Sequence, residues 1–551
     1  MSKMLVVTLT LGGLLAGCAL SQPVATADQE PAGSTVTIGL SGDPEGLHPL
    51  VWPRATSEQI FQVVFGGLVR PNENLEYEPY LARSWSISED NRTITFFLRD
   101  DVKWHDGVPF TASDVAFSLN AIAHPDHPGG VWTVVDRIEG VGAVQRGEAE
   151  NISGVQVLDD HTIAITYEVP YAPFLYRMAF HVVPEHILGE QPVSEWERSP
   201  FNQHPVGIGP FRVEEYRPDE HVKLEAFQDY FLGAPQFDTL IYRIGSPGSL
   251  VAQFISGEVD IIEVPVQELP TVEQLSFAAI REHPGPRYLY MAFNVADEKF
   301  QDPQVRRAMW YSIHREQIVD GLLGGQGTPI YCLTPPDRWE YNHELVTPFD
   351  PEEAQRILDE AGWPKDPDKG IRQREGVELQ FELWYPTDRE GVIPYVAAVI
   401  QQNLQGIGLE VLLRVVDSPS LWSQLFPRDA TGAPRAVGPE EFDAVLVSLG
   451  GSGDPTYLRS ELHSHCVAGG GNYTNYVNEA ADRLLDLQAV TLGFQERQSV
   501  FHELFALLRD DPARIPIVVP NVIFAYHTRI SGFSPAANSR TNRIMHWSVA
   551  N

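Results

Sequence analysis

The spacing of hydrophobic residues predicts a strand, a helix and a second strand between residues 379 and 416. Leu379, Phe381 and Leu383 alternate with polar residues, which is the period of a half-buried strand. Residues 393–405 repeat apolar positions at helical spacing, and residues 409–416 again have the composition of a strand. A strand, a crossover helix and a strand form two parallel neighbours, so the pattern indicates an α/β fold.

An earlier segment combines a strand, a turn and a capped helix. Residues 93–99 are β-branched and aromatic, as in a strand, and Asp106-Gly107 predicts a turn. Thr111 is suited to cap a helix, with Asp114 at the third helical position. Because this segment contains no nucleophile, metal cluster or phosphate loop, we interpret it as a structural brace.

Further elements follow the same local rules. Asp302 before Pro303 and Asp350 before Pro351 predict two helix starts. A strand over 442–449, a mostly helical region over 484–508 and a strand over 515–525 complete the second half. The elements of the chain therefore alternate, and no internal repeat interrupts them.

Composition favours a soluble protein of more than one lobe. The chain has 551 residues, too many for one ordinary domain, and its 43% hydrophobic and 21% charged residues are typical of globular proteins. The formal net charge of −35 excludes a basic nucleic-acid-binding face and attachment to anionic lipid by charge. We interpret the acidity as a solvated surface.

The N-terminus has the features of an export signal. Lys3 precedes an apolar stretch, residues 4–15, that is too short to span a bilayer. Leu15-Ala16-Gly17-Cys18 resembles a bacterial lipobox, which predicts cleavage before Cys18 and lipidation of its thiol. The alternative is an ordinary signal peptide with an unrelated cysteine. Residues 19–33 are small and polar and predict a flexible tether.

The segment from Leu98 to Leu119 resembles one family closely. This family is the family 5 extracellular solute-binding proteins of ABC importers, which include oligopeptide-, dipeptide- and nickel-binding proteins. The matching residues are Arg99, Asp101-Val102, Trp104, Asp106-Gly107 and Ala112-Ser113-Asp114-Val115. Gly207-Ile208-Gly209-Pro210-Phe211 and Phe293-Asn294 are two further landmarks, whereas His314 stands where relatives have aspartate.

The resemblance implies a two-lobed periplasmic-binding-protein fold of type II, closed by a hinge. Lobe 1 would comprise residues 34–286 and 527–551, with an extra subdomain at about 74–203, and lobe 2 residues 287–526. We expect a monomer without cofactor, and the lipobox predicts that it is anchored by lipid at the cell envelope. Its closed form would deliver a solute, with peptides the working class, to the ABC permease, and ATP would be hydrolysed elsewhere.

Aromatic residues near the expected cleft are candidates for contact with the solute, because rings bury large areas at low entropic cost. Trp384 is favoured among them, since it lies at a strand end, where ligands of α/β sheets bind. Core or hinge packing is the alternative interpretation of each ring, and for a ring taken alone it is the favoured one. The candidates are Trp52, Tyr331, Trp384, Trp422 and Tyr457.

An acidic ligand residue of the family is missing. In peptide-binding relatives an aspartate after a late strand clamps the α-ammonium group of the ligand, and Gly451 occupies the matching position. An unpaired ammonium in a closed cleft would cost several kcal/mol. Either Asp454 or Glu45 takes this role, or the solute is not an ordinary peptide.

Cys332 and Cys466 remain as two thiols of an exported protein, and we predict a disulfide between them; two buried free thiols are the alternative. His463-Ser464-His465-Cys466 suggests a metal site, but this segment supplies too few ligands. We therefore predict no metal.

Nothing in the sequence singles out an enzyme, because no nucleophile elbow, zinc-protease motif or phosphate loop is present. A hydrolase acting on glycans and a surface adhesion or chaperone-like module remain alternatives from other classes. Within the binding class, oligosaccharides, opine-like conjugates and nickel complexes compete with peptides.

Overall fold

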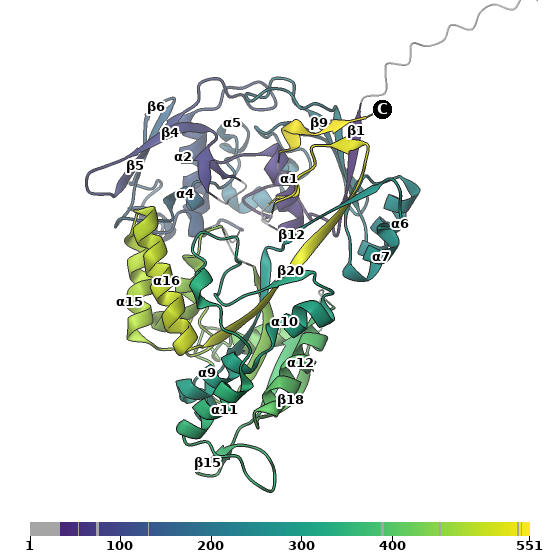
Figure 1. Ribbon diagram of the computed structural model, residues 1–551. Coiled ribbons are helices and arrows are strands. Elements are labelled where there is room, and N and C mark those ends of the chain that lie inside the picture. The colour runs from purple at the N-terminus through teal and green to yellow at the C-terminus, as the bar shows by residue number, and fades with distance from the viewer. Residues whose placement is uncertain are drawn as a thin grey trace, which may run out of the picture.

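The computed structural model describes residues 34–52, 54–72, 76–129, 132–386, 391–450, 453–536, 539–541 and 543–550. The predicted signal peptide with Cys18, the tether over residues 19–33, and Gly451 lie outside these residues. The described chain forms two α/β lobes, one built from the N-terminal and C-terminal parts and the other from the middle (Figure 1).

One large mixed sheet of twelve strands passes through both lobes. Its order is β18-β17-β19-β13-β20-β11-β1-β10-β9-β8, and β12 and β14 also pair with β20. In the first lobe the strands are β1 (Thr35–Leu40), β8 (Phe211–Arg217), β9 (His221–Ala226), β10 (Thr239–Ile244), β11 (Ile261–Glu263) and β12 (Ala278–Pro284). In the second they are β13 (Arg287–Phe293), β14 (Gly327–Pro329), β17 (Gln380–Pro386), β18 (Glu410–Val416) and β19 (Ala444–Gly450).

Strand β20 (Arg514–His527) is shared between the lobes. Its first residues pair with β13 and β14, and its last, from Asn521, pair with β12 and β11. The other connection is the short link from β12 to β13, where Gly285 N–H donates to the carbonyl oxygen of Pro520 at 2.9 Å. The two links thus cross side by side, which is the geometry of a hinge. The predicted lobe boundaries at 286/287 and 526/527 stay a prediction.

The predicted strand–helix–strand unit is confirmed. Strand β17, helix α12 (Ile393–Gly406) and strand β18 follow in order, and Leu383 pairs with Leu413 in a parallel register. The region 484–508 is helical as predicted, but Thr491-Leu492-Gly493 divide it into α15 (Glu479–Val490) and α16 (Phe494–Asp510). The two helices stand beside the boundary between the lobes (Figure 1).

A separate four-stranded sheet lies in the first lobe. Its antiparallel order is β4-β5-β7-β6, and all four strands fall inside the predicted subdomain. Their bounds are β4 (Ala82–Ile87), β5 (Thr93–Leu98), β6 (Val155–Asp159) and β7 (Thr162–Thr166). The short pairs elsewhere are β2 (Val69–Pro71) with β3 (Tyr77–Pro79), β15 (Gln373–Arg374) with β16 (Val377–Glu378), and β21 (Ile530–Ser531) with β22 (Ser548–Val549).

The predicted capped helix after β5 is confirmed, and its contacts explain why we interpret this segment as a structural brace. Helix α2 (Ala112–Ala123) begins after Thr111, whose N–H donates to Asp114 Oδ2 at 2.9 Å. The same buried carboxylate accepts Trp104 Nε1–H at 3.3 Å and the Glu185 N–H at 3.0 Å. Asp114 therefore ties the turn, the helix start and a distant loop together.

The remaining helices cover the sheets, and two of them start at the predicted caps, Asp302 and Asp350. Their bounds are α1 (Ala55–Val64), α3 (Val141–Gln145), α4 (Phe174–Arg177), α5 (Glu185–Leu188), α6 (Pro247–Ser256), α7 (Leu269–Val272), α8 (Glu298–Gln301), α9 (Pro303–Ser312), α10 (Arg315–Gln317), α11 (Pro351–Glu360), α13 (Ser418–Leu425) and α14 (Tyr457–Leu462).

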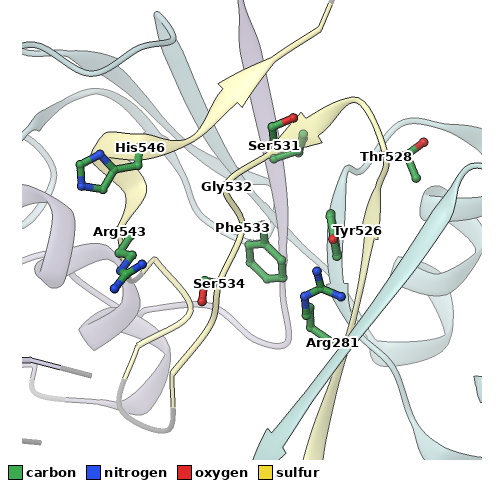
Figure 2. A pocket seen from close by; sticks show the side chains of 10 residues that line it. Arg281, Tyr526, Thr528, Ser531, Gly532, Phe533, Ser534, Arg543 and His546 are labelled. Atoms are coloured by element: carbon green, nitrogen blue, oxygen red, sulfur yellow. The ribbon is translucent and has the colours of Figure 1, made fainter. Parts of the chain in front are cut away.

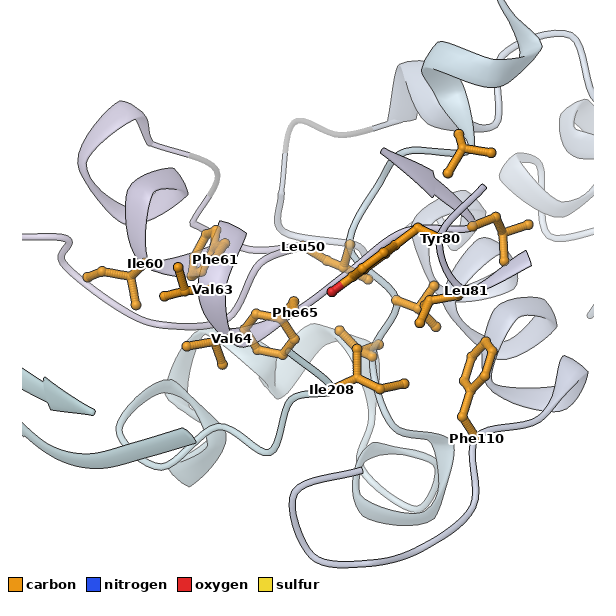
Figure 3. Close-up of a cluster of buried hydrophobic side chains, with 14 of the residues drawn as sticks. Leu50, Ile60, Phe61, Val63, Val64, Phe65, Tyr80, Leu81, Phe110 and Ile208 are labelled. Atoms are coloured by element: carbon orange, nitrogen blue, oxygen red, sulfur yellow. The ribbon is translucent and has the colours of Figure 1, made fainter. Parts of the chain in front are cut away.

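The core of the first lobe explains the glycine landmark. Phe61, Val64 and Ile208 belong to one buried cluster (Figure 3). Ile208 N–H and Gly209 N–H both donate to the Val64 carbonyl oxygen at 2.8 Å, and a Cβ at Gly207 would collide with that oxygen. The glycines therefore serve close backbone packing and not phosphate binding.

Candidate ligand site between the lobes

The lobes touch where the segment after β19 approaches β3 and α4. A Cβ at Gly453 would lie 2.5 Å from Tyr77 Oη and 3.0 Å from the ring of Tyr176, so only a glycine fits the approach. The Ala172 N–H of the first lobe also donates to the Ala489 carbonyl oxygen of α15 at 2.8 Å. We call Tyr77, Tyr176 and Gly453 the interlobe contact.

Asp454, which directly follows the interlobe contact, is held by a buried arginine. Arg497 of α16 donates from Nη1 to Oδ2 at 2.8 Å and from Nη2 to Oδ1 at 2.7 Å, a two-pronged pair. Thr456 adds its N–H at 2.9 Å and its hydroxyl at 2.6 Å, both to Oδ1. Both members of the ion pair are buried, with side-chain exposures of 8% and 7%. The structure thus gives Asp454 a partner within the protein.

The electrostatics of the pair favour its charged form. Burial by itself would raise the pKa of Asp454, but the charge and hydrogen bonds of Arg497 outweigh it, and the pKa of Asp454 is lowered. Asp454 in turn contributes, after burial, to raising the pKa of Tyr77 across the boundary. The negative charge of Asp454 therefore interacts with Arg497 in its own lobe and raises the pKa of Tyr77 in the other lobe.

Lowering the pH is expected to cancel the stabilisation from Asp454. Because folding lowers this pKa, the contribution is present above the unfolded pKa of about 3.9 and is lost as the pH falls through the folded value. The difference in free energy of unfolding between wild type and Asp454→Asn should be constant from about pH 5 to about pH 7 and shrink below about pH 4. Urea unfolding across this range measures it, and a gap unchanged at the acid end would contradict the prediction.

A second loop completes the second lobe's side of the boundary. The Tyr457 hydroxyl donates to the Leu333 carbonyl oxygen at 3.0 Å, which joins α14 to the loop that follows β14. In that loop the ring of Trp339 packs on Phe494 and Phe501 of α16, with centroid distances of 5.2 and 5.5 Å. The loop thereby rests on the same helix that supplies the partner of Asp454.

The aromatic candidates are placed mainly by packing and are not gathered into one cluster. Trp384 is buried, its Nε1–H donates to Glu382 at 2.8 Å, and Arg414 stacks on its ring at 4.5 Å. Tyr331 is also buried, and its hydroxyl donates to Glu316 at 2.8 Å.

Trp422 and Tyr457 have different surroundings. Trp422 lies on α13, is 36% exposed and stacks on the neighbouring ring of Phe426. Tyr457 is placed beside Asp454 by the turn that begins α14. Of the aromatic candidates in the second lobe, Tyr457 is the one next to the interlobe contact.

The first-lobe candidates share the loop after β1. Glu45 has a left-handed backbone with a φ of 65° and lies 3.6 Å from Arg54 in an exposed ion pair. Trp52 is half-buried, packs where a Cβ of Gly46 would collide with it, and has a buried Nε1–H without a hydrogen-bond partner among the described residues. The contacts that hold both side chains come from the first lobe.

Comparison with known proteins identifies the family to which this two-lobed chain belongs. The family model described as bacterial extracellular solute-binding proteins, family 5 Middle, matches residues 76–469, which is more than half of the chain. This chain belongs to that family.

Relatives of the chain within family 5 are similar over nearly their whole length. The oligopeptide-binding protein AppA of Bacillus subtilis is 26% identical over 99% of this chain and 98% of its own length. The dipeptide-binding protein of Escherichia coli is 26% identical over 91% of this chain and 92% of its own length.

Solved structures agree with the two-lobed fold. AppA from Bacillus subtilis in complex with a nonapeptide has a TM-score of 0.72 at 25% identity, covering 94% of this chain and 99% of that one. NikZ from Campylobacter jejuni in complex with Ni(L-His) has a TM-score of 0.74 at 24% identity, with coverage of 93% and 99%, and supports the fold alone.

The family fixes the general role and location of its members. Family 5 proteins bind solutes outside the cytoplasm and work with ABC permeases. In the described part of this chain, no helix combines the length and the apolar character needed to cross a bilayer.

The predicted disulfide is wrong, because Cys332 and Cys466 are both free thiols in the structure. Cys332 is buried in the second lobe, where its Sγ lies 3.7 Å from the carbonyl oxygen of Asn342. Cys466 lies in a 3-10 turn and packs closely against Gly470. An oxidising compartment permits a disulfide, but separate backbone positions decide whether two thiols meet.

Alkylation of the denatured protein without reductant is expected to label both Cys332 and Cys466. In the folded protein Cys332 should react far more slowly, because burial raises the pKa of its thiol to about 12 and its exposure is 1%. Mass spectrometry of the labelled peptides measures both reactions, with a reduced sample as the control. A disulfide-linked peptide containing both residues would contradict the prediction.

The metal hypothesis for the His463–Cys466 segment receives no geometric support. The His463 ring stacks on His465 at 4.9 Å, and its Nε2 lies 3.4 Å from Asp486. Within the described ranges, no group of three or more histidine, cysteine, aspartate or glutamate side chains is arranged to hold a metal ion.

A surface hollow of about 590 Å³ lies elsewhere, beside the last residues of β20 (Figure 2). Arg281 and Tyr526 project from one side, and Arg543 and His546 from the other. Its lining comes from β12, the end of β20 and the C-terminal segment. The hollow is therefore separate from the interlobe contact.

Sequence reasoning missed several residues at the boundary. Arg497 carried a usable signal, because it shares the apolar face of α16 with Phe501 and Leu508, and a charge on such a face needs a buried partner. Tyr77 and Tyr176 carried none, since only the fold brings them to Gly453.

Proposed function

We propose that this chain is the solute receptor of an ABC importer and captures peptides between its two lobes. The observation that carries the proposal is the match of the whole two-lobed chain to AppA, whose solved structure contains a nonapeptide. Gly453 and Asp454 from one lobe lie opposite Tyr77 and Tyr176 from the other at the boundary where a solute would be enclosed.

The mechanism is binding coupled to closure. The β12–β13 link and strand β20 join the lobes side by side, so rotation about Gly285 and Pro520 would open the boundary at the far end. A solute that contacts both lobes stabilises the closed form by its extra affinity for that form. The closed protein then presents one surface to the permease, and no chemical step is assigned to the chain.

The proposal includes the membrane anchor. Cleavage before Cys18 and lipidation of its thiol would leave residues 19–33 as the tether of a monomeric receptor at the cell envelope. Acyl chains contribute about 0.8 kcal/mol for each buried CH₂ group, so several chains hold a soluble body at a membrane.

Native mass spectrometry of the purified protein, followed by thermal shift against chemically defined solutes, tests this function. The solutes are peptides of two to nine residues, cello- and manno-oligosaccharides, and nickel–histidine. A peptide at a concentration 100-fold above its dissociation constant should add about 2.7 kcal/mol to the free energy of unfolding.

The possible outcomes separate the alternatives. Stabilisation by peptides, with the peptides recovered intact, supports the proposal. Stabilisation by a sugar or by nickel–histidine alone would keep the transport role and overturn the peptide class. Consumption of the added solute would overturn the assignment as a binding protein in favour of a hydrolase.

A further inference from the structure

Glu340 is a buried carboxylate beside the interlobe contact with one unused oxygen. The residue is 2% exposed. Its Oε1 accepts the Thr334 hydroxyl at 2.5 Å, and its Oε2 has no hydrogen-bond partner among the residues that the structure describes. Burying such an oxygen without a partner is costly, and a native protein seldom leaves it so without a function.

The position of Glu340 follows from the elements around it. Trp339, its neighbour in the chain, packs on α16, and the Trp339 carbonyl oxygen accepts the Gln498 side-chain N–H at 2.5 Å. The Thr334 that bonds Glu340 follows Leu333, whose carbonyl oxygen accepts the Tyr457 hydroxyl at 3.0 Å. Because Tyr457 begins α14 just after Asp454, these contacts place Glu340 near the interlobe contact.

The two buried carboxylates at this boundary, Asp454 and Glu340, differ in how far positive charge compensates them. Arg497 neutralises Asp454 through two hydrogen bonds. For Glu340, burial raises the pKa most, and the Thr334 hydrogen bond and the charge of Arg338 offset only part of this effect. An additional positive charge at Oε2 would complete the site.

We propose that Glu340 recognises a positively charged group of the bound solute, an ammonium or a guanidinium, through its unused oxygen Oε2. This inference rests on the proposed function, because it assumes that the solute occupies the boundary between the lobes. The cation can come from a peptide N-terminus or from a lysine or arginine side chain.

Binding of matched peptides by calorimetry tests the assignment. The first peptide is trialanine, whose only cation is the α-ammonium. The second is N-acetyl-trialanine, which has none, and the third is N-acetyl-Ala-Lys-Ala, whose only cation is a side chain. If longer peptides bind better in the thermal shift, the same three forms are made at that length.

The variant Glu340→Gln keeps the size of the side chain and its Thr334 hydrogen bond but removes the charge. We expect it to weaken binding of the preferred cationic peptide on the order of 30-fold and to leave the uncharged peptide unaffected. Glu344→Gln is the matched control, since it removes the same charge from an exposed position of the same loop and should change neither affinity. Glu340→Asp retains the charge and should retain the preference, which keeps the test decisive if Glu340→Gln folds poorly.

The outcomes distinguish a failure of the assignment to Glu340 from a failure of the proposed peptide-binding function. If wild type binds peptides and Glu340→Gln retains the full preference for the cationic form, the assignment to Glu340 is overturned and the proposed function stands. If wild type binds the three forms equally, no cation is recognised and the inference is again overturned alone. If wild type binds no peptide of any length, the proposed peptide function fails, and the inference fails with it.

Discussion

Arg497→Met is expected to lower the free energy of unfolding by about 3–5 kcal/mol. Methionine keeps an unbranched apolar stem, whereas the guanidinium that lies over the rings of Trp339 and Phe501 is removed together with its charge. It removes the charged partner of Asp454, which is buried and receives two hydrogen bonds from this guanidinium. The loss is large because the remaining carboxylate is charged and cut off from water.

Urea unfolding monitored by tryptophan fluorescence measures the effect of Arg497→Met. Arg212→Met is the control, because Arg212 and Glu225 form an exposed pair, with side-chain exposures of 48% and 49%, whose loss should cost about 1 kcal/mol or less. Adding Asp454→Asn to Arg497→Met should recover part of the stability, since the unpaired charge disappears. A cost for Arg497→Met no larger than that of the control would contradict the buried-pair interpretation.

Gly453→Leu is expected to weaken solute binding about 100-fold while the protein remains folded. The new side chain would enter space already occupied by Tyr77 and Tyr176 of the other lobe. Overpacking of this kind costs about 1–3 kcal/mol, and here the cost falls on the closed form, because opening the lobes relieves it. Calorimetric titration with the peptide found by thermal shift measures the affinity.

Two further variants make the Gly453→Leu result specific. Gly248→Leu adds the same side chain at a position with nothing within 4 Å of the new Cβ and should leave the affinity unchanged. Adding Tyr77→Ala to Gly453→Leu should restore part of the affinity by making room. Unchanged binding by Gly453→Leu would show that closure does not bring Gly453 against the first lobe in the bound state.

Sequence rules for caps, periodicity and motifs were sufficient to predict a feature when its signal lies within a few residues. The capped start of α2 is set by Thr111 and Asp114, which are three positions apart, and the pairing of β17 with β18 follows from one short alternating pattern and one helix. The landmarks between Leu98 and Leu119 were enough to indicate the family, because they are ordered and closely spaced.

Contacts between distant segments were not accessible in the same way. Cys332 and Cys466 have the composition of a disulfide in an exported protein, yet both thiols are free, since the backbone holds them in separate surroundings. Asp454 was a candidate ligand residue because of its place after a strand, and its pairing with Arg497 depends on how α16 packs against that turn.

The sequence by itself determined the α/β class, the main strands and helices, and the membership in a family of solute-binding proteins, because each depends on periodicity, caps or closely spaced motifs. The tertiary structure alone decided which carboxylates at the boundary are paired. Asp454 finds a cation within the protein and Glu340 keeps an unused oxygen, because hydrogen bonding of a buried group depends on which distant side chains folding brings within about 3 Å of it.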